Sequence, residues 1–405
     1  MPELKLLFLQ MAVVLISARV LAFGFRRIGQ PAVIGEMAAG ILLGPSLLGK
    51  ISPSTMGSLF PAGGMAPLYA LSQVGLVLFM FLVGLEVRPE SLRGSAKSVV
   101  IASQASIAAP FVLGGALAWA LHSRLGEGAP RLPFVLFLGA AMGVTAFPVL
   151  ARILADRGLT KTRMGAIAIS CAAFDDVTAW CLLAVVTVIA RPEAADNSLR
   201  LRFAGLIAYV LAMALLVRPA LRRFLPRNEK PGSGAFGAAM ILLLLSAWTT
   251  EALAVHALFG AFLAGLVMPR AGTLEEVLRE RLESVTLGLL LPLFFAYTGL
   301  RTSIGLLNRI ELWFLCGLIV MVAVLSKLLV SAVAVHTSGL SWRESIGVGI
   351  LVNTKGLVEL VILNVGLDLH ILSPTLFSMM VIMALVTTLM TQPLLDWVSP
   401  SRTLQ

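Results

Sequence analysis

Long apolar stretches recur along the whole chain, and short segments that hold most of the charged residues separate them. A helix needs about 20 apolar residues to cross about 30 Å of hydrocarbon. By that measure the chain predicts thirteen membrane-spanning stretches. In residue numbers they are 5–23, 31–49, 66–86, 98–121, 133–155, 162–191, 202–219, 235–251, 255–269, 284–300, 310–336, 343–366 and 375–397. The pattern therefore predicts an all-α polytopic membrane protein.

The least regular part of this pattern is the pair of stretches between residues 235 and 269. One long kinked helix also fits it, but the polar run Thr249, Thr250 and Glu251 indicates a break. With two helices here, the chain divides into six helices, one helix and six helices. Two six-helix halves joined by a single helix are inverted relative to each other, which is the usual arrangement in secondary transporters.

The fifth helix of each half is interrupted at a corresponding place. Residues 143–148, which end in Pro148, interrupt the first, and residues 353–356 interrupt the second. Proline removes a backbone donor, and glycine loosens a helix. Matched broken segments are the best pointer in a sequence to a transporter's binding site. We therefore expect the site near these two breaks.

Composition supports the membrane assignment and excludes other classes. Apolar residues make up 58% of the chain and charged residues only 13%, whereas a soluble domain averages about 25% charged residues. A disordered chain, a secreted disulfide scaffold and a nucleic-acid module are excluded. The net charge of +10 reflects basic loops. Lys and Arg are more frequent in the loops of one side, which predicts an external N-terminus and a cytoplasmic C-terminus.

Two adjacent acidic residues, Asp175 and Asp176, lie in the middle of the stretch 162–191. A charge at mid-membrane costs about 2.5–3.5 kcal/mol on insertion scales and indicates function. Adjacent helical residues point about 100° apart, so the two carboxylates can face different partners. Carboxylate oxygen is a hard ligand that suits an alkali cation or a proton. We predict that Asp176 and Asp175 bind the metal cation and protons; the alternative is a salt-bridged pair that only holds the helices together.

A lysine, Lys327, lies near the middle of the stretch 310–336. A buried lysine keeps its charge only beside an acidic partner, and either Asp175 or Asp176 is the natural candidate. The alternative is a lysine whose ammonium group reaches the membrane interface.

The two interruptions also carry polar residues with a predicted structural role. The first contains Thr145, and the second contains Asn353, Thr354 and Lys355. A broken helix leaves unpaired backbone groups and opposed dipole ends, which a Lys355 cation and a Thr145 hydroxyl can satisfy.

Three glutamates are weaker candidates: Glu86, Glu251 and Glu359. Glu359 is spaced for an i, i+4 ion pair with Lys355. We expect acidic residues in such positions to stabilise helix ends.

Four segments resemble signatures of one transporter family. They are residues 34–45 (IGEMAAGILLGP), 79–86 (FMFLVGLE), 145–154 (TAFPVLARIL) and 353–360 (NTKGLVEL). Together they resemble the monovalent cation:proton antiporter-2 family of sodium(potassium)/proton exchangers, and the last two resemble its plant cation/proton exchanger branch. The match extends over nearly the whole chain.

The resemblance implies the sodium/proton antiporter fold, in which two broken helices cross at mid-membrane. A mobile core would comprise residues 98–191 (helices 4–6) and 310–397 (helices 11–13). A dimerisation domain would comprise residues 1–97 and 235–309, and residues 192–234 would form a linker helix. The implied protein is a homodimer in a bacterial inner membrane, where the core moves like an elevator.

Residue roles follow from the same resemblance. It places cation and proton binding on Asp176, an ion pair with Lys327 on Asp175, and Thr145 and Lys355 at the crossing. The plant branch usually has Asn where this chain has Asp175. An Asp-Asp pair resembles the electrogenic sodium/proton exchangers of the family. The implied activity is electrogenic exchange of sodium or potassium for protons, with membrane lipid around the protein, no cofactor, no nucleic-acid partner and no enzymatic reaction.

Other functions fit these residues less well. A sodium-coupled symporter of an organic anion would need a roomy polar cavity, but the neighbours of Asp175 and Asp176 are apolar. An intramembrane aspartyl protease needs two aspartates on different helices that share a proton, whereas Asp175 and Asp176 are adjacent on one helix. A channel would show no obligatory proton counterflow.

Overall fold

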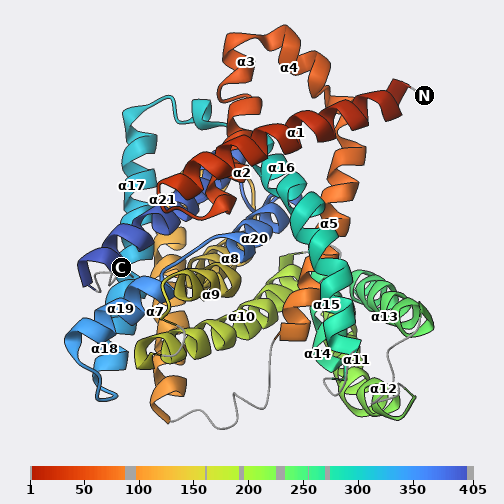
Figure 1. Cartoon of the computed structure of the whole chain (residues 1–405). Coiled ribbons are helices and arrows are strands. Elements are labelled where there is room, and N and C mark those ends of the chain that lie inside the picture. Colours follow the sequence, from red (N-terminus) through yellow and green to blue (C-terminus); the bar gives the residue numbers. More distant parts are fainter. Residues whose placement is uncertain are drawn as a thin grey trace. The chain divides into compact units, whose positions relative to one another are not determined.

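The computed structural model describes residues 2–86, 97–159, 162–190, 196–224, 233–253, 255–269 and 274–398. Regular structure in these ranges is entirely helical (Figure 1). In hydrocarbon every backbone N–H and C=O needs an internal partner, and a helix supplies one within its own segment. The prediction of an all-α protein is therefore confirmed for the described part of the chain.

Each of the thirteen predicted stretches coincides with one or more helices. Nine helices in the described ranges are long and apolar enough to cross a membrane. The four other stretches hold shorter helices or helices that include residues outside the description: α8 with α9, α10, α14, and α19 with α20.

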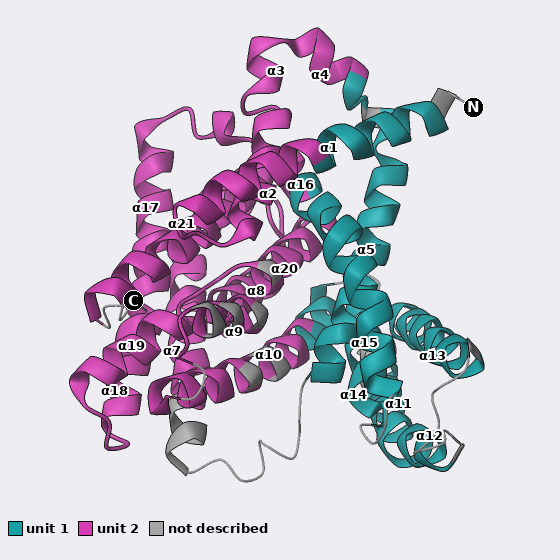
Figure 2. Ribbon diagram, viewed as in Figure 1, with its two compact units in different colours: residues 1–15, 59–89, 184–297 teal, residues 16–58, 90–183, 298–405 magenta. Residues whose placement is uncertain are grey.

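The chain divides into two compact units (Figure 2). Unit 1 comprises residues 1–15, 59–89 and 184–297. Its elements are the first part of α1 (Pro2–Arg27), η1 (Ala62–Gly64), α5 (Ala66–Glu86), α11 (Asp196–Ala212), η2 (Met213–Val217), α12 (Arg218–Phe224), α13 (Ser233–Ala252), α14 (Ala257–Val267), α15 (Leu274–Val285), η3 (Thr286–Leu290) and most of α16 (Leu291–Arg301).

Helices α5 and α14 of unit 1 approach each other at glycines. A Cβ atom added at Gly84 would collide with the backbone oxygen of Phe262, and one added at Gly265 would collide with that of Phe81. Small residues let membrane helices pack backbone to backbone, where van der Waals contact replaces the hydrophobic effect.

Unit 2 comprises residues 16–58, 90–183 and 298–405 and contains both broken helices. Its elements are the second part of α1, α2 (Ala32–Leu43), α3 (Leu48–Ile51), α4 (Pro53–Leu59), α7 (Lys97–Leu125), α8 (Arg131–Gly143), α9 (Phe147–Asp156), most of α10 (Arg163–Ala190), η4 (Ile304–Leu306), α17 (Ile310–Val324), η5 (Leu325–Leu329), α18 (Val330–His336), α19 (Trp342–Val352), α20 (Leu357–Asp368) and α21 (Pro374–Val398).

The two predicted interruptions lie between α8 and α9 and between α19 and α20. The order of elements around them repeats. A long helical segment comes first, which is α7 in one case and α17 to α18 in the other. A broken helix follows, and another long helix, α10 or α21, comes next.

The break predicted at Thr249, Thr250 and Glu251 lies a few residues further along the chain. Helix α13 continues to Ala252, and α14 begins at Ala257. The threonines do not end the helix because their hydroxyl groups donate to carbonyls one turn earlier. Thr249 Oγ1 bonds to the oxygen of Leu245 at 2.7 Å.

Candidate functional site

The carboxylate of Asp175, on α10, is fully buried and accepts hydrogen bonds from three hydroxyl groups. Thr145 Oγ1 donates to Asp175 Oδ2 at 2.6 Å. Ser106 Oγ lies 2.9 Å from both carboxylate oxygens, and Ser103 Oγ lies 3.3 Å from Oδ1. The serines come from α7 and the threonine from the first break, so three segments of the chain converge on one carboxylate.

Lys327, which is also fully buried, is the ion-pair partner of Asp175. Its Nζ lies 3.2 Å from Asp175 Oδ2. It also donates to the carbonyl oxygen of Ser106 at 3.3 Å and to that of Gly143. Lys327 lies in the π-helical turn η5, and such single turns within α-helices occur often at functional sites. The residues by themselves left Asp175 and Asp176 open as partners, and the family resemblance implied Asp175; the structure places Asp175 against the lysine.

The two breaks touch each other through backbone and side-chain hydrogen bonds. The amide of Ala146 donates to the carbonyl oxygen of Thr354 at 3.0 Å. The Thr145 hydroxyl, which also faces Asp175, lies 3.0 Å from the carbonyl oxygen of Val352. Groups that a continuous helix would pair internally are thus paired across the crossing, as hydrocarbon requires.

Lys355 sits at the C-terminal end of α8 and is fully buried. Its Nζ donates to the carbonyl oxygens of Ala141 at 3.2 Å, Met142 at 2.9 Å and Val144 at 3.3 Å. Its fourth partner is Glu359 Oε2 at 3.1 Å, one turn later in the chain. A cation at the negative end of a helix dipole is favourable, and the glutamate lies in the first turn of α20, where an anion is favourable.

Asn353 contributes a buried amide group whose hydrogen-bonding capacity is unused. The side chain is 1% exposed, and neither its nitrogen nor its oxygen has a hydrogen-bond partner among the described residues. The neighbouring Thr354 hydroxyl lies 3.1 Å from that of Thr391. Unpaired buried polar groups are rare in proteins, so Asn353 marks a place where a polar ligand or water fits.

Asp176 follows Asp175 on α10, but its side chain lies outside the described residues. The structure therefore brings six of the seven predicted site residues to one crossing. It also adds two that the sequence reasoning missed, Ser103 and Ser106. Their spacing of three residues, which puts both on one face of α7, is the local signal that could have indicated them.

The two remaining glutamates lie at helix ends, as the sequence indicated. Glu86 ends α5 and pairs with Arg279 at 3.2 Å. Glu251 Oε2 accepts the backbone amide of Ala257, the first residue of α14, at 3.0 Å.

The polar groups at the crossing are carboxylate, hydroxyl, amide and carbonyl oxygens, together with the ammonium groups of Lys327 and Lys355. No group of three or more His, Cys, Asp and Glu residues that could hold a metal ion occurs within the described ranges. Oxygen donors of this kind suit a hard alkali cation that binds and leaves.

Residues 12–397 match the family model for the transmembrane region of sodium/hydrogen exchangers. The chain belongs to this sodium/hydrogen exchanger family. The match includes both broken helices and every residue of the crossing. The protein is an integral membrane protein.

Relatives of this exchanger-family chain include bacterial, plant and yeast proteins. It is 42% identical to the Na(+)/H(+) antiporter NhaS4 of Synechocystis over 404 residues, which is 98% of each protein. It is 38% identical to the cation/H(+) antiporter 17 of Arabidopsis thaliana and 33% identical to the K(+)/H(+) antiporter 1 of Saccharomyces cerevisiae. The chain spans about half the length of these last two, 48% and 47%.

The fold is that of a solved exchanger. The sodium proton antiporter MjNhaP1 of Methanocaldococcus jannaschii superposes with a TM-score of 0.73 over 98% of this chain and 99% of that one. The two are only 15% identical, so the likeness establishes the architecture alone. The expectation of a sodium/proton antiporter fold is confirmed.

Proposed function

We propose that this exchanger-family chain is a secondary-active antiporter that exchanges a monovalent cation for protons across a membrane. The observation that carries the proposal is the fully buried pair of Asp175 and Lys327, 3.2 Å apart at the crossing of the two broken helices. Ionisable side chains buried beside broken helices are typical of ion and proton sites in transporters.

The charges at the crossing make Asp176 the residue that needs a counter-ion. The described charged groups there are two acids, Asp175 and Glu359, and two bases, Lys327 and Lys355, which balance each other. A cation can bind in this medium of low dielectric constant only against a further negative charge, and we assign that charge to Asp176, the next residue of α10. Sodium or potassium and protons therefore compete for Asp176.

The transport cycle follows from this competition. When the site is open to the cytoplasm, Asp176 loses its proton and binds the cation, and Lys327 leaves Asp175 or gives up its proton. The loaded site crosses, and protons on the other side displace the cation. An empty site with unpaired carboxylates does not cross, because unpaired buried charges are costly. That cost couples the two fluxes. A second proton, carried by Asp175 or Lys327, would make two protons exchange for one cation and so make the exchange electrogenic.

The moving part is proposed to be the core of residues 98–191 and 310–397, which contains the whole crossing. Residues 1–97 and 235–309 would form the dimerisation domain of a homodimer, with residues 192–234 as the linker helix. The core would move like an elevator in a bacterial inner membrane, with the N-terminus outside and the C-terminus in the cytoplasm.

The relatives narrow the substrate class without choosing one cation. Their names include a sodium/proton antiporter and a potassium/proton antiporter, and both support cation/proton exchange over symport of an organic anion. The plant branch usually has Asn at the position of Asp175. The Asp-Asp pair resembles the sodium/proton exchangers of the family, which favours sodium over potassium as the substrate.

Proton flux in proteoliposomes that contain a trapped pH dye tests the proposal. Addition of sodium, lithium, potassium or rubidium is expected to drive proton movement that depends on membrane potential. Asp176→Asn should abolish this movement. Asp396→Asn is the matched control, because that carboxylate is 55% exposed and pairs with Arg157 at the end of α21. Exchange at the wild-type rate in Asp176→Asn would refute the assignment.

A further inference from the structure

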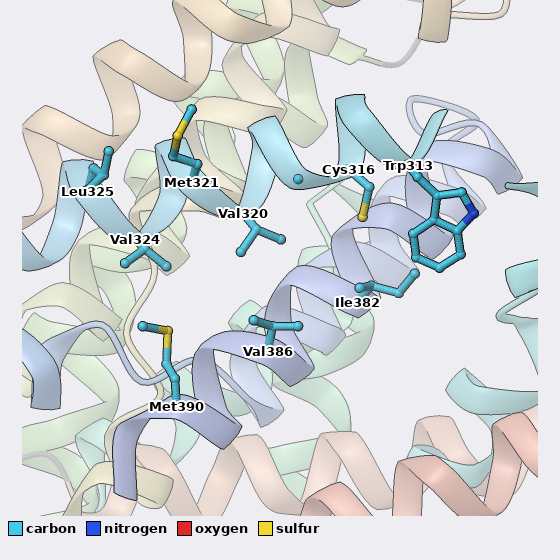
Figure 3. A pocket seen from close by; sticks show the side chains of 10 residues that line it. Trp313, Cys316, Val320, Met321, Val324, Leu325, Ile382, Val386 and Met390 are labelled. Carbon is cyan, nitrogen blue, oxygen red and sulfur yellow. The ribbon is translucent and has the colours of Figure 1, made fainter. Parts of the chain in front are cut away.

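A groove with a volume of about 530 Å³ lies between α17 and α21 in unit 2 (Figure 3). Its ten lining residues are all apolar. Val320 and Val324 project from α17 toward α21, and Val386 projects from α21 toward α17 (Figure 3). A groove with no polar lining side chain cannot coordinate a cation, so it is separate in chemistry from the crossing.

One of the residues that line the groove is a glycine, Gly317. A Cβ atom added at Gly317 would meet no atom within 4 Å, whereas one added at Gly349 of α19 would meet the Leu328 oxygen at 2.5 Å. Packing within unit 2 therefore requires Gly349 but does not require Gly317. The groove is therefore open at Gly317, where no side chain fills it.

The length of the groove matches one leaflet of a bilayer. From Trp313 to Leu325 the helix rises about 18 Å at about 1.5 Å per residue. Half of the hydrocarbon thickness is about 15 Å. Trp313, which is 44% exposed, stands at one end of the groove, and an indole ring is favoured where the membrane meets water.

A positive charge lies beyond the tryptophan end. Arg309 precedes the first residue of α17 and is exposed. It is the N-cap residue of α17, four residues before Trp313, so it lies at the tryptophan end of the groove. The nearby negative charge of Glu311 is already paired with Arg124 at 2.8 Å. The positive charge of the Arg309 guanidinium favours a phosphate group.

We propose that this groove binds one membrane phospholipid, with an acyl chain between α17 and α21 and the phosphate at Arg309. The wholly apolar lining favours an acyl chain. The length of the groove fits a lipid in one leaflet, and the arginine favours a phosphorylated headgroup. The proposal does not depend on which ions the crossing transports.

The test uses phosphatidylglycerol that carries a photoreactive diazirine midway along one acyl chain, reconstituted with the full chain. After illumination, labelled peptides are mapped by mass spectrometry. Label is expected on residues 313–325 and 382–390 in excess over α13, where Ile241 and Leu244 are 60% and 63% exposed. The comparison with α13 accounts for lipid that merely surrounds the protein.

Variants then separate the two parts of the site. Gly317→Phe fills the groove and should remove its label while label on α13 remains. Gly237→Phe on α13 is the matched control, because an added Cβ there also meets no atom within 4 Å. Arg309→Gln should lower groove labelling about fivefold with phosphatidylglycerol, and not at all with a diacylglycerol probe that lacks phosphate.

Two outcomes would overturn the proposal: equal labelling of α13 and the groove, and wild-type labelling in Gly317→Phe. Size-exclusion chromatography establishes that Gly317→Phe is folded. If it is not, Val386→Trp fills the groove from the opposite wall and must give the same loss of label.

Discussion

Removing one member of the Asp175–Lys327 pair is expected to cost more stability than removing both. At 3.2 Å, two unit charges attract each other with about 5 kcal/mol at an effective dielectric constant of about 20. Both side chains are fully buried, so Lys327→Met leaves an uncompensated carboxylate and Asp175→Asn leaves an uncompensated ammonium group. Breaking one side of a buried pair costs about 3–5 kcal/mol.

The double variant, Asp175→Asn with Lys327→Met, removes both charges together. The remaining hydrogen bonds can rearrange around it, because the Thr145 hydroxyl has an alternative acceptor in the Val352 carbonyl at 3.0 Å. We therefore expect the double variant to lose no more stability than the less stable single variant. The free energies of unfolding are measured in mixed detergent micelles with increasing dodecyl sulfate.

The pair of Arg124 and Glu311 is a control for burial. Its atoms are closer, at 2.8 Å, but its side chains are 60% and 55% exposed. Exposed pairs contribute about 0–1 kcal/mol, so Arg124→Gln and Glu311→Gln should change little. If the two single changes at the buried pair add within about 0.5 kcal/mol in the double variant, the reasoning is wrong.

Three further predictions concern the structure around the pair. Lys355→Met should lower stability by about 3 kcal/mol, because it removes the cation at the end of α8 and leaves Glu359 unpaired; adding Glu359→Gln should recover part of the loss in the same micelle assay. Ser106→Ala should cost about 1–3 kcal/mol, since both oxygens of the buried carboxylate lose a donor; an unchanged unfolding midpoint would contradict the geometry. Gly265→Ala should destabilise the packing of α5 on α14, whereas Gly237→Ala, in open space, should be neutral or stabilising by up to about 1 kcal/mol; equal thermal unfolding of the two variants would refute this.

The sequence was most informative where the determining chemistry is local. The breaks at residues 143–148 and 353–356 were predictable because glycine and proline act on their own helix. It was less informative at the end of α13. The polarity of Thr249 and Thr250 predicted a break in the helix. In the structure each hydroxyl group bonds to a carbonyl of the preceding turn, so the helix continues through them.

The spacing of the residues could not show which aspartate pairs with Lys327. Lys327 is 152 residues from Asp175, and only the family resemblance favoured Asp175 over Asp176 before the structure was known. Ser103 and Ser106 were missed because serine in an apolar helix usually satisfies itself on the preceding turn. The π-helical turn that carries Lys327 has no residue signature, since it depends on the neighbours that hold the helix in that state.

By itself, then, the sequence determined that the chain is a membrane protein of about thirteen helices with two broken ones, because hydrocarbon enforces helices and a few residue types interrupt them. It also identified the charged residues in the membrane, since their cost does not depend on the fold. The tertiary structure alone decided which carbonyls Lys355 contacts and which hydroxyl groups surround Asp175. Those contacts join segments up to 214 residues apart, and only packing brings such segments together.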